Sequence, residues 1–105
     1  MPLLTKGFDP ALLPDHFQRH GADFGAASPQ EYEAMADQFL GSPLTPPTQE
    51  CIRRSNSDIL RFDPITNEFG VLSNNGMIRT YYKPNPWNKK KFPTNLAYFS
   101  AECAK

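Results

Sequence analysis

His16 and His20 are the two histidines of the chain, and they are four residues apart. On a helix this spacing places both imidazoles on the same face. A histidine transfers protons readily near neutral pH because its ordinary pKa is about 6.5. Two metal ligands can have the same spacing, but the sequence offers no HExxH arrangement and no evident third ligand. The pair therefore indicates acid–base chemistry that needs neither a metal nor another cofactor.

RNA cleavage without a metal is one reaction that such a histidine supports. The 2′-hydroxyl loses a proton as it attacks the adjacent phosphate, the leaving 5′-oxygen gains one, and the extra charge on the phosphate needs stabilisation. Arginine, lysine and hydroxyl donors suit the last task. The chain offers such groups at Arg19, Arg53, Arg54, Arg79, Thr80, Tyr81, Tyr82 and Lys83.

Strand geometry narrows this set of donors. Residues 77–83, MIRTYYK, are rich in β-branched and aromatic residues and predict a strand, along which side chains alternate between the two faces. Thr80 and Tyr82 are then able to approach one phosphate together, although both are also ordinary strand residues. Arg79 joins them only if the strand twists or carries a bulge. The expected faces are Ile78, Thr80 and Tyr82 on one side, and Met77, Arg79, Tyr81 and Lys83 on the other.

The charges of the chain are unevenly distributed, although 11 basic and 11 acidic residues cancel overall. Residues 1–52 carry two basic and seven acidic groups, whereas residues 53–105 carry nine basic and four acidic groups, which gives formal charges of −5 and +5. Within segment 84–93, Lys89 and Lys90 stand among aromatic residues. Such a basic half suits RNA phosphates and unpaired bases, and a solvated surface gives the same pattern.

Two helices are predicted in the first part of the chain. Residues 9–21 predict a helix that starts near Asp9-Pro10 and ends at a glycine. The second helix is predicted to start at the N-cap Ser28, where Glu31 completes a capping box, and to end at Gly41. Its apolar residues recur with helical spacing and are expected to face the core.

The second part of the chain predicts a sheet. After a proline-rich linker over residues 42–50, the runs CIRRS, DILRFD, NEFGVLS and MIRTYYK are strand-like and are separated by polar turns, among which Asn75-Gly76 is the strongest hairpin signal. A last strand is expected over residues 95–102. Helices followed by an antiparallel meander indicate an α+β fold, with N-terminal helices packed on a twisted antiparallel sheet of four to five strands. We expect one domain over residues 1–105, with a helical part at 9–41 and a sheet part at 50–103.

Cys51 and Cys103 lie far apart in the sequence and show no metal-binding spacing. Each is either a buried apolar residue or one half of a disulfide, and the second alternative requires passage through an oxidising space. No window of the sequence approaches the roughly 18 apolar residues of a membrane span.

Four segments, in order, resemble the colicin D-like tRNase domains and the C-terminal toxin domains of contact-dependent growth inhibition systems. Residues 18–25, QRHGADFG, resemble that family's basic-His-small-small-Asp-Phe-Gly motif. Residues 52–54 resemble its Tyr-Arg-Arg run, residues 61–67 its aromatic-x-Pro-x-Thr hairpin, and residues 75–83 its Asn-Gly-x-x-x-Ser-x-Trp-Lys strand. The wider group is that of the barnase/EndoU/colicin/RelE-like nucleases, whose fold is N-terminal helices on a twisted antiparallel sheet.

The resemblance implies roles for the matched residues. His20 takes the place of the general acid/base, and Arg19 that of the basic residue that contacts phosphate. Thr80 stands where the family has a serine hydroxyl, and Tyr82 where it has a tryptophan. The residues that remain as substrate-binding candidates are Arg53, Arg54, His16, Lys83, Lys89 and Lys90.

Phe17 departs from the family pattern, because colicin D has a lysine three positions before its histidine. His16, Arg53 or Arg54 is a candidate for the missing positive charge. The resemblance implies cleavage in or near the tRNA anticodon loop to 2′,3′-cyclic phosphate and 5′-hydroxyl ends. It also implies a cognate immunity protein, and a monomeric domain that is secreted or delivered by a larger effector and acts in the target-cell cytoplasm. A non-catalytic RNA-binding or interaction module of the same fold is the alternative.

Overall fold

Helices precede an antiparallel sheet in this chain, as the sequence predicts, and the fold class is α+β. The computed structural model describes residues 3–84 and 94–105. Its elements, in chain order, are α1 (Leu13–His20), a short 3₁₀ helix (Gly21–Phe24), α2 (Pro29–Gly41), β1 (Gln49–Ile52), β2 (Ile59–Phe62), β3 (Phe69–Leu72), β4 (Ile78–Tyr82) and α3 (Asn95–Ala104).

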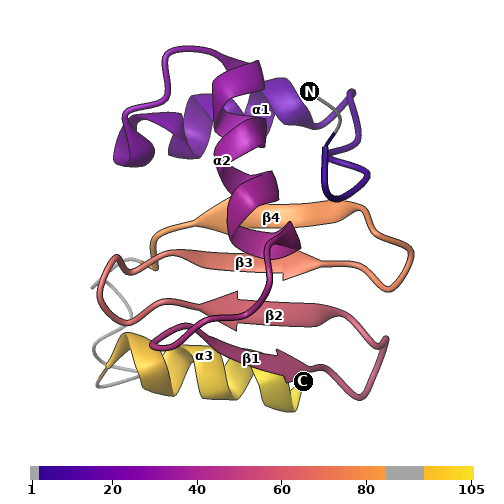
Figure 1. Ribbon diagram of the computed structural model, residues 1–105, viewed down its shortest axis with the longest axis vertical. Helices are drawn as coiled ribbons and strands as arrows, with labels where there is room; N and C mark the ends of the chain where they lie inside the picture. The colour runs from indigo at the N-terminus through magenta and orange to yellow at the C-terminus, as the bar shows by residue number, and fades with distance from the viewer. Residues whose placement is uncertain (1–2, 85–93) are drawn as a thin grey trace.

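The four strands form a meander in the order β1-β2-β3-β4, with every neighbouring pair antiparallel (Figure 1). Each of the three hairpin turns contains one residue with positive φ: Ser57 at 62°, Asn67 at 65° and Gly76 at 92°. Serine, asparagine and glycine suit such tight turns for local steric and hydrogen-bonding reasons. The turns predicted from the sequence are therefore confirmed.

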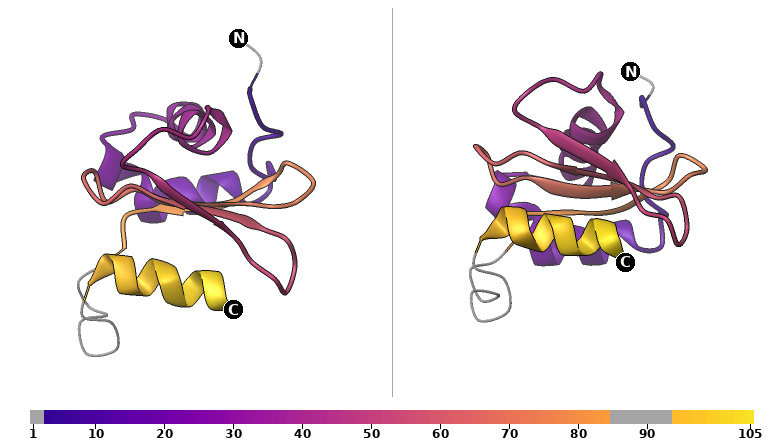
Figure 2. Two further views of the ribbon diagram at one scale, coloured as in Figure 1. Left: turned by 60° about the horizontal axis from the view of Figure 1, so that its bottom comes forward. Right: turned by 90° about the horizontal axis from the view of Figure 1, so that it is seen from below.

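The helices surround the sheet on three sides. Helix α2 covers one face of the sheet, α3 lies on the opposite face, and α1 runs along the free edge of β4 (Figures 1 and 2). Each face has its own core. The core under α2 contains Phe8, Tyr32, Ala36, Leu40, Ile78 and Tyr81, and the core under α3 contains Leu60, Phe62, Phe69, Val71 and Phe99.

The two N-terminal helices start differently. Helix α2 has the predicted cap, because the Ser28 hydroxyl accepts the backbone N–H of Glu31 at 3.1 Å. Helix α1 starts at Leu13, later than the sequence predicts, because Asp9 forms a turn of its own in which its carboxylate accepts the Ala11 N–H at 2.9 Å. The two histidines nevertheless lie in the last two turns of α1, as the spacing requires.

The prediction of a strand over residues 95–102 is wrong, because this segment belongs to helix α3. Its N-cap is Thr94, whose hydroxyl accepts the Ala97 N–H at 3.0 Å. Phe99 inserts into the core between α3 and the sheet. Cys51 and Cys103, for which the sequence leaves two alternatives, form a disulfide that joins β1 to α3.

Candidate functional site

His20 packs its ring on Tyr82, which connects the C-terminal end of α1 with the end of β4. The ring centroids are 5.3 Å apart and the planes are inclined by 27°. Burial lowers the pKa of His20 below 6.5, the neighbouring Arg19 lowers it further, and Asp23 and Asp15 act in the opposite direction. The imidazole is therefore neutral at pH 7, which is the state that accepts a proton.

His16 lies one helical turn before His20, and the two ring centroids are 6.2 Å apart. Its ring also contacts Phe8, with centroids 5.1 Å apart. Burial is the largest cause of its lowered pKa, followed by the charges of Arg19 and His20. Its Nδ1 atom is buried and has no hydrogen-bond partner among the described residues. This environment favours the neutral ring, so His16 does not supply a permanent positive charge in place of the family's lysine.

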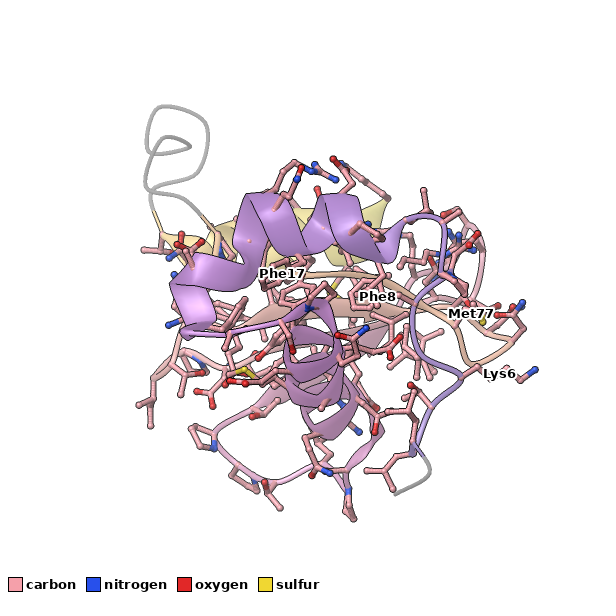
Figure 3. The ribbon with its side chains drawn as sticks, turned by 90° about the horizontal axis from the view of Figure 1, so that it is seen from above. Lys6, Phe8, Phe17 and Met77 are labelled. Atoms are coloured by element: carbon pink, nitrogen blue, oxygen red, sulfur yellow. A yellow bond between two sulfur atoms is a disulfide. The ribbon has the colours of Figure 1, made fainter. Side chains whose placement is uncertain are left out.

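Helix α1 runs beside β4 in the same direction, which aligns the histidines with the strand. Figure 3 shows Phe8 and Phe17 lying beneath α1, and the Phe8 backbone bridges in parallel to Ile78 at the start of β4. Four helical residues advance about 6 Å, and two strand residues advance about 6.6 Å. Because His20 lies against Tyr82, His16 lies nearer the start of β4, where its ring contacts Phe8.

The predicted faces of β4 are partly wrong, because the strand carries an irregularity. Thr80 pairs with Val71 whereas Ile78 pairs with Leu72, so Arg79 is an extra residue in the ladder. As a result Ile78 packs in the core under α2 together with Tyr81, and does not share a face with Thr80 and Tyr82. Thr80 and Tyr82 pair with Val71 and Phe69 of the core under α3, so the expectation that these two share a face is correct.

As the extra residue, Arg79 does not have to share a face of the sheet with Tyr81 and Lys83, although regular alternation predicts that it does. Its Nε lies 2.8 Å from Oδ2 of Asp58, which makes an ion pair, and this carboxylate is fully buried just before β2. Arg53 lies 3.8 Å from the same carboxylate oxygen and also binds Glu102 of α3. Such a bulge is one of the exceptions that the sequence allows. Because of it, Arg79 and Arg53 lie against the same carboxylate, near the C-terminal end of α3.

The phenol of Tyr82 hydrogen-bonds with that of Tyr98 on α3. Burial and this hydrogen bond raise the pKa of Tyr82 well above its ordinary value. Tyr82 therefore stays protonated at physiological pH and supports His20 by stacking rather than by releasing a proton. The charge of Glu102 raises this pKa further, and the charge of Arg53 acts in the opposite direction.

The remaining predicted site residues that the structure describes form no hydrogen bond, ion pair or ring contact with His16 or His20. Arg19 forms an exposed ion pair with Asp15 at 2.7 Å on α1. Arg54 is exposed after β1. The Lys83 ammonium lies 5.4 Å from the centre of the Phe24 ring, which is a cation–π contact. Lys89 and Lys90 lie outside the described residues.

Three residues that contact Arg53 or Tyr82 are not predicted from the sequence, namely Asp58, Tyr98 and Glu102. Asp58 follows a predicted turn, which explains an aspartate without any site. The sequence predicts a strand over Tyr98 and Glu102, and residues four apart share a helix face only in a helix. The signal that was available is Thr94, a good N-cap residue before an apolar segment.

Two cavities among the described residues lie away from His20. One of about 510 Å³ lies at α2 and is lined by Glu31, Ala34, Met35, Gln38, Phe39, Glu68 and Tyr81. The other, of about 280 Å³, lies beside the turn before β4 and includes Arg79. The larger cavity combines apolar side chains with two carboxylates, which is unsuited to a phosphate.

Comparison of the sequence with models of known protein families finds no match. A search of curated proteins finds no match either. Within residues 3–84 and 94–105 there is no cluster of three metal-binding side chains. In the same residues, no helix has the length and apolar character needed to cross a membrane.

Proposed function

We propose that this protein is a metal-independent endoribonuclease toxin that cuts tRNA in or near the anticodon loop and leaves 2′,3′-cyclic phosphate and 5′-hydroxyl ends. The observation that carries the proposal is the packing of His20 on Tyr82, with His16 one turn away and Thr80 on the same face of β4. The choice of tRNA rests on the resemblance of residues 18–25 and 75–83 to the colicin D-like tRNases.

His20 acts first, as the base of the reaction. Its neutral imidazole takes the proton of the 2′-hydroxyl while the oxygen forms a bond to phosphorus, and the bond from phosphorus to the 5′-oxygen breaks. The 5′-oxygen takes up the proton that His20 removed, so His20 acts as base and then as acid and returns to its neutral state. The Thr80 hydroxyl donates to a non-bridging phosphate oxygen and stabilises the charge that develops there.

Delivery from outside the target cell agrees with the disulfide between Cys51 and Cys103, because disulfides form in oxidising compartments. In this proposal the domain is carried by a larger effector and acts as a monomer in the target-cell cytoplasm. Its producer is protected by an immunity protein, which covers the surface around His20 and Arg79.

The test is cleavage of total tRNA by the purified protein in EDTA. We expect discrete fragments, and sequencing of their ends gives both the tRNA and the bond. His20→Ala is expected to abolish cleavage with an unchanged circular dichroism spectrum. The matched control is Gln18→Ala, an exposed position on the same helix, which is expected to cut like the wild type.

Two results contradict the proposal. Full activity of His20→Ala, or a requirement for a divalent metal, excludes this mechanism. Retardation of tRNA on a gel without any cleavage indicates the non-catalytic RNA-binding module instead.

A further inference from the structure

Arg79 and Asp58 form an ion pair that the cleavage chemistry at His20 does not use. Asp58 is fully buried, whereas the Arg79 side chain is 54% exposed. The pair spans three strands, since Asp58 precedes β2 and Arg79 belongs to β4, with β3 between them. A charged side chain that reaches across a sheet to a buried carboxylate is held in a defined orientation.

The Asp58 side chain is held through one carboxylate oxygen, Oδ2, whereas Oδ1 is buried and has no hydrogen-bond partner among the described residues. Its carboxylate accepts the Asn56 side-chain amide at 3.1 Å, and its backbone N–H donates to Asn56 at 3.0 Å. Arg53 adds a second positive charge at 3.8 Å. Because burial of an isolated carboxylate costs several kcal/mol, these partners are needed to keep Asp58 in place. The carboxylate is thus a rigid support for Arg79.

The remaining guanidinium donors of Arg79 have no protein partner within the described part of the chain. Arginine has five N–H donors in a planar fork, and the structure assigns only Nε, to Asp58. Arg79 also borders the cavity of about 280 Å³, where the one carboxylate, Asp9, accepts the Ala11 N–H. An exposed guanidinium fork beside such a space is suited to bind a phosphate.

We infer that Arg79, oriented by Asp58, binds an RNA phosphate other than the one that is cleaved at His20. The inference rests on the proposed function, because it assumes RNA as the ligand. Arg79 and Tyr82 are three strand residues apart, about 10 Å, and the Arg79 guanidinium reaches the Asp58 carboxylate just before β2. The phosphate at Arg79 is therefore more than one nucleotide step away from the phosphate at His20, and Arg79 sets the register of the RNA strand.

The direction in which Asp58→Asn changes the affinity for RNA distinguishes this role from a general electrostatic effect. Asp58→Asn removes a negative charge, so nonspecific attraction predicts tighter RNA binding. If Asp58 orients Arg79, the same change weakens binding, because the guanidinium loses its support. Arg79→Lys provides a second distinction, since it keeps the charge but removes the fork.

The experiment measures binding of a 2′-O-methyl oligoribonucleotide with an anticodon-loop sequence by fluorescence anisotropy at several salt concentrations. This probe lacks the attacking hydroxyl, so binding is independent of cleavage. We expect Arg79→Ala to weaken binding about tenfold and to reduce the salt-dependence slope by about 0.7, the value for one phosphate contact. Asp58→Asn and Arg79→Lys are expected to weaken binding, and Gln30→Ala, at an exposed position on α2, is expected to have no effect.

Wild-type affinity in Arg79→Ala, full restoration by Arg79→Lys, or tighter binding by Asp58→Asn overturns the inference. Should Asp58→Asn fail to fold, the comparison of Arg79→Ala with Arg79→Lys still decides it. Binding of the oligonucleotide without cleavage of tRNA overturns the proposed function alone. If the wild-type protein cuts tRNA but does not bind the oligonucleotide, the inference alone is overturned, and if it does neither, both are overturned.

Discussion

The acid–base behaviour of His20 is set by its burial against Tyr82 and by two neighbouring charges of opposite sign, Arg19 and Asp23. As the base, His20 must be unprotonated, so kcat/KM is expected to fall as the pH drops through its lowered pKa, which lies below 6.5. Removal of the positive charge in Arg19→Gln moves this acidic limb to higher pH. Asp23→Asn moves it to lower pH. Rates of tRNA cleavage between pH 4.5 and 8 measure both shifts.

The opposite signs of these two shifts provide the control. A limb that stays in place in both variants, or that moves in the same direction in both, shows that another group controls the rate. Arg19→Gln also removes the ion pair with Asp15, so the position of the limb and not the maximal rate is compared.

Single residues of the candidate site were predictable to the extent that local rules place them. Helical spacing brings His16 and His20 to one face, and the pairing of Thr80 and Tyr82 follows from strand alternation. The position of Arg79 was not predictable, because the bulge depends on how β3 and β4 align over their whole length. The support from Asp58 and Tyr98 comes from elements that are distant in the sequence.

At the scale of elements, the two N-terminal helices and four strands follow from caps, periodicity and turn residues. Helix α3 was missed because residues 95–102 are apolar enough to pass for a buried strand, and periodicity alone does not separate the two over so short a run. What fixes α3 is tertiary structure: Phe99 in the core, the hydrogen bond of Tyr98 with Tyr82, and the disulfide to β1.

The disulfide between β1 and α3 is expected to contribute strongly to stability. It closes a loop of 52 residues, for which the loss of chain entropy in the unfolded state is about 4 kcal/mol. Reduction should lower the free energy of unfolding by up to this amount, measured by urea denaturation with and without reductant. The double variant Cys51→Ser/Cys103→Ser should match the reduced protein and be insensitive to reductant. Equal midpoints for the oxidised and reduced wild type contradict the expectation.

The whole molecule presents two faces with different chemistry. Toward α3 it presents His20, Tyr82, Arg53 and Arg79, and the ion pairs there leave Arg79 exposed. Toward α2 it presents the larger cavity, whose rim carries Glu31 and Glu68. Zero net charge means that the protein as a whole does not attract a polyanion, so RNA must be selected by the face that carries the cations.

Filling the cavity at α2 tests which face the RNA uses. Ala34 lines this cavity and is exposed, so Ala34→Trp is expected to fill part of it and to leave tRNA cleavage unchanged. Thr80→Val, which removes a hydroxyl on the opposite face, should slow cleavage because the phosphate loses one hydrogen-bond donor. Initial rates with both variants, together with their melting temperatures, decide the point. If Ala34→Trp folds normally but no longer cuts, while Thr80→Val remains active, the substrate lies on the α2 face, because only that face has been blocked.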